Sequence, residues 1–256
     1  MDQASLMGAA LAAARAAAAL VLDGHRSHPT TRAKSSATDL VTDYDLRSER
    51  LIRDALGDTK LPIVGEEEGG ESHQGPTWYI DPIDGTTNFA HGHFMFCISI
   101  GLLDHGVPIV GAVVAPALQT AWYGCAEQGA FRNGAPCHVS QTECLSDSLI
   151  ATGFAPIAIG KEPHENLARF SRVLPHARGI RRDGSAALDL CMTADGTFDA
   201  YWESSLHPWD IMGGAAIALA SGATITGFGG GPADFLSGDV VVSNGRVHQE
   251  LLSRLQ

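Results

Sequence analysis

The chain has 256 residues, of which 45% are hydrophobic and 18% charged, as in a soluble globular protein with a sizeable core. Its 17 basic and 29 acidic residues give a net charge of −12. That charge argues against a nucleic acid as the main partner, because phosphate backbones are bound through Lys and Arg. A phosphorylated small molecule is not excluded, since a bound metal ion can reverse the local charge.

The N-terminal segment predicts a helix over residues 4–22, rich in Ala and Leu and ended by Asp23 and Gly24. Its apolar run could pass for the core of a signal peptide. However, Asp2 stands where positive charge is expected, Arg15 interrupts the run, and the run is shorter than the ~20 residues of a membrane span. We therefore expect a packed amphipathic helix and no membrane partner.

Two further elements precede the centre of the chain. Residues 25–36 are polar and typical of an exposed loop, and residues 46–56 predict a second helix. Residues 61–65 predict a short strand that leads into three consecutive glutamates, of which Glu66 is the first. On its own, such an acidic run is most often a solvated loop.

The most informative segment is residues 78–89, WYIDPIDGTTNF, which places the carboxylates of Asp81 and Asp84 three positions apart. Its first residues predict a buried strand that Pro82 ends, and Gly85 can adopt a backbone conformation that other residues resist. The residues that follow are favoured at helix N-termini. Carboxylates bind hard divalent cations, and a helix N-terminus binds anions. A cation site beside an anion site is what phosphate-ester chemistry requires.

The rest of the chain is a β-rich block followed by alternating helices and strands, which predicts a layered α/β architecture. A boundary near residue 140 would separate an N-terminal α+β half, 1–140, from a C-terminal α/β half, 141–256, within one compact catalytic unit. The expected strands are 96–103, 109–115, 120–123, 149–152, 177–180, 198–202, 223–226 and 240–243, with a turn near 130–136. The expected helices are 162–174, 185–194, 211–221 and 246–255.

Other motifs point to no competing chemistry. The five cysteines contain no C-x-x-C pair, which predicts reduced thiols in a cytoplasmic protein and no zinc site. The glycine-rich run at 227–231 lacks a following Lys-Ser or Lys-Thr and is therefore not a P-loop. Asp210 precedes a helix of small residues and is expected to be its N-cap, a role that Asp often fills without any other function.

Three motifs occur in the order and at the spacing of the inositol monophosphatase family: GEE at 65–67, the segment 78–89, and WD at 209–210. The chain resembles that family over nearly its whole length. The resemblance implies a magnesium-dependent, lithium-sensitive phosphatase, a hydrolase of phosphate monoesters that is commonly a homodimer. It also implies an α/β (α+β) fold, the layered α-β-α-β-α sandwich of the inositol monophosphatase and fructose-1,6-bisphosphatase type.

The resemblance also assigns metal ligands by motif position. Glu66, Asp81, the Ile83 carbonyl and Thr86 would surround a first Mg²⁺ ion. Asp81, Asp84 and Asp210 would hold a second, and some family members hold a third near Glu66. Magnesium takes few carboxylates and accepts phosphate oxygens, and two such ions can clamp an in-line displacement.

The catalytic residues implied are Glu66, Thr86 and Asp84. Glu66 and Thr86 would orient and deprotonate a metal-activated water, which attacks phosphorus opposite the ester oxygen. A water near Asp84 and Asp210 would supply the proton to the leaving alkoxide. The phosphate itself is expected on the backbone N–H groups of Gly85 and Thr86.

For the alcohol, the resemblance points to Asp210, Glu203 and the segment Gly184, Ser185 and Ala186, while Lys34 matches a loop lysine of relatives. Glu203 could instead be an exposed carboxylate at a strand end, and Ser185 could serve as a helix cap. Arg182 and Asp183 depart from many relatives, which leaves the identity of the alcohol open.

The reaction expected is hydrolysis of myo-inositol monophosphate to inositol and phosphate, which Thr87 after Thr86 favours as in the inositol-phosphatase branch. The same chemistry on histidinol phosphate, fructose-1,6-bisphosphate or a nucleotide phosphate is an alternative. A regulatory binding protein of the same fold is an alternative from another class.

Overall fold

The structure is a computed structural model that describes residues 1–26, 31–33, 40–154 and 165–256. Lys34 and the start of the helix predicted over 162–174 lie outside the described residues.

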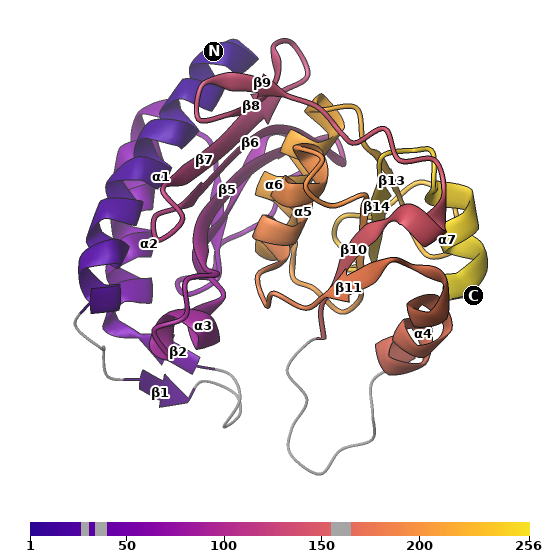
Figure 1. Cartoon of the computed structure of the whole chain (residues 1–256). Helices are drawn as coiled ribbons and strands as arrows, with labels where there is room; N and C mark the ends of the chain where they lie inside the picture. The colour runs from indigo at the N-terminus through magenta and orange to yellow at the C-terminus, as the bar shows by residue number, and fades with distance from the viewer. Residues whose placement is uncertain (27–30, 34–39, 155–164) are drawn as a thin grey trace.

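The first half of the chain forms helices and a seven-stranded sheet with the strand order β3-β4-β5-β6-β7-β8-β9 (Figure 1). β3 and β4 are parallel, and every later neighbour pair is antiparallel. The helices are α1 (Gln3–Arg26), α2 (Asp43–Leu56) and α3 (Thr86–Ala90), with a 3₁₀ turn η1 (Gly57–Thr59). The strands are β1 (Thr31–Ala33), β2 (Leu40–Thr42), β3 (Ile63–Gly65), β4 (Thr77–Asp84), β5 (Cys97–Asp104), β6 (Val107–Ala115), β7 (Thr120–Cys125), β8 (Gly129–Arg132) and β9 (Ala135–Cys137).

The second half forms a five-stranded sheet with the order β11-β10-β12-β14-β13. β10 is parallel to both of its neighbours, whereas β14 is antiparallel to β12 and β13. The strands are β10 (Leu149–Thr152), β11 (Gly179–Arg181), β12 (Ala200–Glu203), β13 (Thr224–Thr226) and β14 (Val240–Ser243). The helical elements are η2 (Leu145–Asp147), α4 (Glu165–Val173), η3 (Leu174–His176), α5 (Ala186–Ala194), α6 (Pro208–Ala220) and α7 (His248–Leu255).

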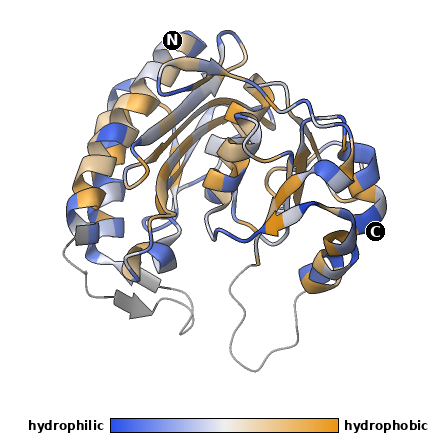
Figure 2. Cartoon of the chain, in the orientation of Figure 1, coloured by the Kyte–Doolittle hydropathy of each residue, from blue (hydrophilic) through white to orange (hydrophobic). Residues whose placement is uncertain are grey.

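These elements stack as five layers (Figure 1), which confirms the predicted α-β-α-β-α sandwich. Successive strand residues point to opposite faces of a sheet. In β4, Trp78 and Ile80 pack towards α1 and α2, whereas Tyr79 packs towards α5 and α6. In β12, Tyr201 faces the same central layer, and Trp202 faces α4 and α7. Figure 2 shows the central helices as largely apolar and the C-terminal helix α7 as more hydrophilic.

The N-terminal helix is longer than predicted. It continues through Gly24 to Arg26, because the ring of Tyr44 packs where a side chain at Gly24 would lie, so the glycine supports packing there instead of ending the helix. At 24 residues, α1 is long and apolar enough to cross a membrane by length and composition, contrary to the expectation from sequence. In this structure a stripe of its side chains is buried against the sheet: Leu6, Ala10, Ala13, Ala14, Ala17 and Val21.

Other boundaries differ for local reasons. α2 starts three residues earlier than predicted, at Asp43, because Thr42 and Asp45 form a capping box. The turn expected near 130–136 is the tip of a β8–β9 hairpin, in which Asn133 and Gly134 both have positive φ.

The central helix α6 lies backbone against backbone on the seven-stranded sheet. A Cβ atom added at Gly101 of β5 would stand 2.3 Å from the Met212 carbonyl carbon, and one at Gly111 of β6 would stand 2.1 Å from the Gly213 oxygen. Because α6 carries Asp210 in its first turn, this close approach sets the position of that carboxylate relative to the sheet.

We predict that Gly111→Ala destabilises the protein by about 1–3 kcal/mol, because the added methyl group must push α6 off the sheet. Gly8→Ala in α1 is the matched control. Nothing lies within 4 Å of its added Cβ, and alanine should stabilise the helix by roughly 0.5–1 kcal/mol. Urea denaturation of both variants measures the difference, and equal stabilities would contradict the packing argument.

Candidate active site

The two carboxylates of the central motif lie on one continuous strand. The prediction that Pro82 ends the strand is wrong: β4 runs through it to Asp84. The pairing with β5 shifts by one residue between Asp81, opposite Ser99, and Asp84, opposite Cys97. Such a bulge accommodates a proline, which has no N–H to donate to the ladder, and turns nearby side chains away from the regular alternation. The bulge therefore presents Asp81 and Asp84 at the same end of the sheet.

The turn after the bulge joins Thr86 to a carboxylate from α2. Thr86 Oγ1 lies 3.0 Å from the Ile83 carbonyl oxygen and 3.3 Å from Asp45 Oδ1. The other oxygen of Asp45 accepts the N–H of Thr42, at 2.7 Å, as part of the helix cap. Sequence reasoning missed Asp45, although the Thr-x-x-Asp pattern at 42–45 is a helix-start signal that could have drawn attention to it.

Asp84 bonds directly to the second half of the chain. Its Oδ2 accepts the Ser185 hydroxyl at 2.6 Å and the Ala187 N–H at 2.8 Å, at the start of α5. Ser185 occupies the N-cap position of α5, but its hydroxyl serves Asp84 and makes no cap hydrogen bond. The metal motif and the predicted substrate segment are thus in contact.

A second contact between the halves comes from Asn88, for which the sequence suggested only a place at a helix N-terminus. Its Nδ2 donates to the Met95 carbonyl at 2.6 Å and to the Asp183 carbonyl at 2.8 Å, with the Gly184 carbonyl at 3.4 Å. Gly184 has a φ of 80° and Gly85 has a φ of 88°, a region that suits glycine. A Cβ added at Gly85 would stand 3.3 Å from the Gly184 oxygen, so the two turns pack closely.

Asp210 does not have the predicted position in its helix. His207 is the N-cap of α6, and Asp210 is the third residue of the helix. The two residues form a capping box, in which Asp210 Oδ2 accepts the His207 N–H at 2.7 Å. Pro208 at the start of the helix displaces the boundary towards the N-terminus, because proline fits the first turn. Asp210 still lies at the N-terminal end of α6.

The carboxylates of the site influence one another. Burial raises the pKa of Asp81 well above its ordinary value, and the charges of Glu66, Asp84 and Asp210 raise it further. Burial raises the pKa of Asp84 to about 6, against the opposing hydrogen bonds from Ser185 and Ala187. Loss of solvation and the Asp84 charge raise the pKa of Asp210 well above its usual value. Glu66, from the turn after β3, also shares a hydrogen bond with Asp81. The predicted carboxylates are therefore brought together.

This donor set fits a hard divalent cation in charge and chemistry. Within residues 1–26, 31–33, 40–154 and 165–256, no three Asp, Glu, His or Cys side chains stand ready as a shared ligand set. Oxygens of Asp84 and Asp210 are instead bonded to protein N–H and O–H groups. A cation would offset the repulsion that raises these pKa values, because it favours the ionised carboxylates. Carboxylate and carbonyl oxygens are the ligands that Mg²⁺ accepts.

Glu203 is a buried carboxyl at the end of β12, not an exposed one. It is 6% exposed and accepts the Tyr201 hydroxyl at 2.6 Å. Burial raises the pKa of Glu203 to about 7, against the opposing effects of Tyr201 and Arg182. The Asp84 charge acts in the same direction as burial, so Glu203 lies within electrostatic reach of the central motif.

Comparison with known proteins identifies the family of the chain. The sequence profile described as the inositol monophosphatase family matches residues 2–256. The chain is 38% identical over 227 residues to an inositol-1-monophosphatase of Synechocystis, covering 87% of this chain and 78% of that protein. It is 36% identical over 251 residues to a putative Nus factor SuhB of Neisseria meningitidis, covering 96% of each. The solved inositol monophosphatase of Anabaena superposes with a TM-score of 0.87 at 35% identity, covering 98% of this chain and 95% of that one.

The raised pKa of Asp84 predicts a pH dependence of the metal-free protein. In the unfolded chain Asp ionises near pH 4, whereas folded Asp84 keeps its proton up to about pH 6. The folded state therefore binds the extra proton, and its stability falls as pH rises from about 4 to about 6, by up to about 3 kcal/mol. Asp84→Asn removes this pH-dependent contribution. The stability of the variant relative to that of the natural protein should therefore rise between about pH 4 and about pH 6.

Urea denaturation in a chelator at pH 4.5, 5.5 and 7 measures the relative stability of the two proteins. Excess Mg²⁺ at pH 7 should lower the stability of the variant relative to that of the natural protein, because the ion favours the ionised carboxylate that the variant lacks. A stability difference that is constant over pH would contradict the electrostatic argument.

Proposed function

The chain belongs to the inositol monophosphatase family and is a phosphoric monoester hydrolase; on this premise we propose that it hydrolyses myo-inositol monophosphate with Mg²⁺. The observation that carries the proposal is the meeting of Asp81, Asp84 and Asp210 with Glu66, from separate segments, beside the start of α5. A phosphate dianion could not approach such a group without cations to offset the negative charge.

The cations would be held by Glu66, Asp81, Asp84, Asp210 and the carbonyl of Ile83. We propose that the site binds two Mg²⁺ ions, and a third as in some family members. When bound, Mg²⁺ offsets the charge of the phosphoryl oxygens and of the leaving oxygen and makes a nearby water more acidic. The remaining steps fall to the protein's own groups.

Thr86 is placed to move a proton. Its hydroxyl can donate to Asp45 while its oxygen accepts a proton from an attacking water, so the proton passes from water through Thr86 to Asp45. Glu66 would accept a second hydrogen bond from that water and orient it. The N–H groups of Gly85 and Thr86 would bind the phosphoryl oxygens.

The alcohol side is formed by the start of α5 and by Glu203. Tyr201 fixes one oxygen of Glu203, so an ionised Glu203 would present the other to a hydroxyl of a polyol. Ser185 is committed to Asp84 and orients that carboxylate, and Gly184 and Ala186 flank it without large side chains. Asp84 and Asp210 together would direct a proton to the departing alkoxide.

The location, the assembly state and the partners of the protein form a further part of the proposal. We propose that the protein acts in the cytoplasm as a homodimer, with no nucleic acid or membrane partner, in keeping with its acidic charge and the absence of a C-x-x-C pair. The alternative of a regulatory binding role draws support from the Neisseria relative, whose name is that of a putative Nus factor. Release of phosphate with Mg²⁺, and its inhibition by Li⁺, separates an enzyme from a binding protein.

We predict that Glu66→Gln and Asp84→Asn each reduce kcat by more than about 100-fold, since each removes a charge from the ion site. Both substitutions keep the size of the side chain, and the amide oxygen introduced at position 84 can still accept from Ser185 and Ala187. Circular dichroism should show an unchanged fold while phosphate release is measured in saturating Mg²⁺. Near-normal turnover of either variant would show that the substituted residue is not catalytic.

Substrate identity is tested by comparing kcat/KM on inositol 1-phosphate, histidinol phosphate, fructose 1,6-bisphosphate and a nucleotide 3′-phosphate. We expect kcat/KM to be highest on inositol 1-phosphate. Glu203→Gln should raise KM for it by roughly 10-fold with a smaller change in kcat, because Glu203 contacts only the alcohol. A different leading substrate would overturn the choice of alcohol while leaving the phosphatase assignment intact.

A further inference from the structure

Glu66 is carried on a tight turn that has little regular structure of its own. The turn joins β3 to the loop before β4, and it is closed where the Gly65 N–H donates to the Gly69 carbonyl at 3.0 Å. The Glu66 N–H reaches the Ile80 carbonyl of β4 at 3.2 Å. A turn of this kind needs further partners to hold its side chains in one place.

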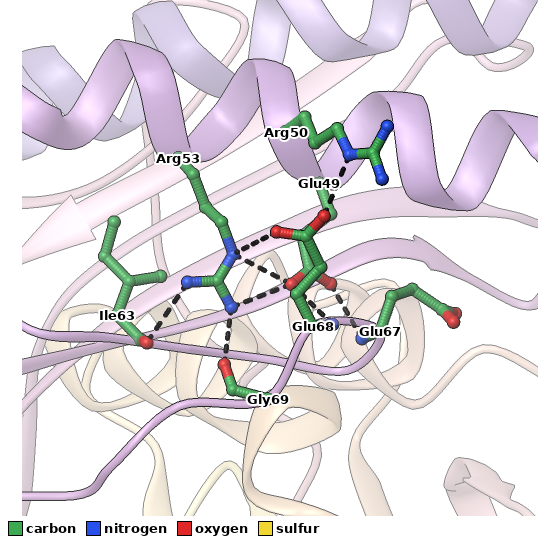
Figure 3. Close-up of polar contacts among 7 residues, drawn as sticks. All are labelled: Glu49, Arg50, Arg53, Ile63, Glu67, Glu68 and Gly69. Carbon is green, nitrogen blue, oxygen red and sulfur yellow. Dashed lines mark hydrogen bonds and ion pairs between the residues drawn. The ribbon is translucent and has the colours of Figure 1, made fainter.

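Those partners come from α2, as Figure 3 shows. The carboxylate of Glu49 is fully buried and accepts the two N–H groups that directly follow Glu66. Its Oε2 lies 2.8 Å from the Glu67 nitrogen, and its Oε1 lies 3.0 Å from the Glu68 nitrogen. The turn thus closes around a carboxylate, which fixes the peptide plane on the C-terminal side of Glu66.

Arg53, one helical turn further along α2, completes the contact. Its guanidinium pairs with Glu49 Oε1 at 2.8 Å and donates to the carbonyls of Ile63, at 3.4 Å, and Gly69, at 2.5 Å. A buried carboxylate is stable only with such pairing. Glu49 and Arg53 therefore hold both ends of the turn: Glu49 accepts from its N–H groups, and Arg53 donates to its carbonyl groups.

Gly65 provides the room for Glu49. A Cβ atom added at Gly65 would stand 2.2 Å from Glu49 Oε1. The φ angle of Gly65 lies outside the left-handed region, so glycine is required there by the lack of space and not by the backbone conformation. Any larger residue at 65 would have to displace the Glu49 carboxylate from the two N–H groups.

The same face of α2 also supports the rest of the site. Asp45 bonds Thr86, and Ser48 donates to the Pro82 carbonyl at 3.0 Å within the β4 bulge. Residues 45, 48 and 49 are neighbours on a helix surface by their spacing. One rigid helix thus sets the relative positions of Glu66, the bulge and Thr86.

We propose that Glu49 is a positioning residue for the reaction: through the N–H groups of Glu67 and Glu68 it orients Glu66, and Gly65 is required because it admits the Glu49 carboxylate. The inference rests on the proposed function, in which Glu66 holds the cation. Glu49 itself acts only through the backbone of the turn. Residues that orient a metal ligand are typically worth 10- to 100-fold in metal affinity or activity.

The test uses Glu49→Gln, Glu49→Ala, Gly65→Ala and the double variant Glu49→Ala/Gly65→Ala. Arg50→Ala is the matched control: it removes the neighbouring ion pair with Glu68 at 2.8 Å, which is exposed to solvent and should contribute little. Mn²⁺ binding to the substrate-free protein, measured by electron paramagnetic resonance, and amide hydrogen exchange at Glu67 and Glu68 are the direct readouts. Steady-state kinetics adds kcat, KM and the Mg²⁺ concentration for half activation.

We expect the Mn²⁺ dissociation constant to rise roughly 10-fold or more in Glu49→Gln and Gly65→Ala, with kcat falling and KM changing less than threefold. Exchange at Glu67 and Glu68 should accelerate, while α2 and β4 keep their protection. In the Glu49→Ala background the space is already open, so adding Gly65→Ala should change Mn²⁺ affinity by less than about twofold. Arg50→Ala should match the natural protein.

Several results would overturn the inference. One is unchanged Mn²⁺ affinity and amide exchange in Glu49→Gln and Gly65→Ala, and another is effects no larger than those of Arg50→Ala. Additive losses in the double variant would separate Gly65 from Glu49. If Glu49→Ala fails to fold, Gly65→Ala still decides the question, because it leaves every charge in place. Glu66→Gln serves as the reference: if that variant binds Mn²⁺ normally, the proposed cation site is wrong, and amide exchange alone then decides whether Glu49 orders the turn.

Discussion

The hydrogen bonds between Asp84 and the start of α5 are the interaction on which the site depends. Asp84 ends a strand of the first sheet, whereas Ser185 and Ala187 open a helix of the second half, so one carboxylate oxygen ties together segments 101 and 103 residues apart. The helix start supplies N–H and O–H donors that a buried carboxylate needs in place of water. This contact fixes the acidic motif of β4 relative to the start of α5. Asn88 reinforces it through the backbone of residues 183 and 184.

The central helix layer performs the same task for Asp210, by a different means. Glycines at the contact of α6 with the sheet bring helix and strand backbones together, and the first turn of that helix carries the carboxylate towards the β4 bulge. Gathering acidic groups in this way opposes folding, since burial and like charge both raise their pKa values. The apolar layers on either side offset that cost, and a bound cation would remove much of it.

Local patterns in the sequence predicted a layered α/β architecture and the acidic motif at 81–84. The α-β-α-β-α order and the metal roles of Glu66 and Asp210 were predicted from the family resemblance. The short apolar run that opens β4 is typical of a strand covered on both faces, and every residue of that strand is buried. The two acids beside a glycine turn are visible as a local motif. The errors concern residues whose roles arise from contacts across the fold. Pro82 stays within a strand because a bulge absorbs it, which no local rule distinguishes from a strand end. Asp45, Glu49 and Asn88 looked like ordinary helix residues, since their partners lie 41, 18 and 95 residues away.

In the proposed function, the reaction and the choice of alcohol depend on different parts of the site. The groups around β4 would handle phosphate and water, whereas Glu203, with Tyr201 and Arg182 as its partners, would face the alcohol. Behind them lies Asp189, whose carboxyl oxygens have no hydrogen-bond partner among the described residues and whose pKa burial raises well above its usual value, with Asp183 and Glu203 adding to the shift. The charge of Glu203 is thus one of the effects that disfavour ionisation of Asp189. Arg182 favours ionisation of Glu203, against the effects of burial and of the Asp84 charge. In the proposed function, the charge that Glu203 offers to a polyol hydroxyl would therefore depend on the balance between Arg182 and the buried acids around it.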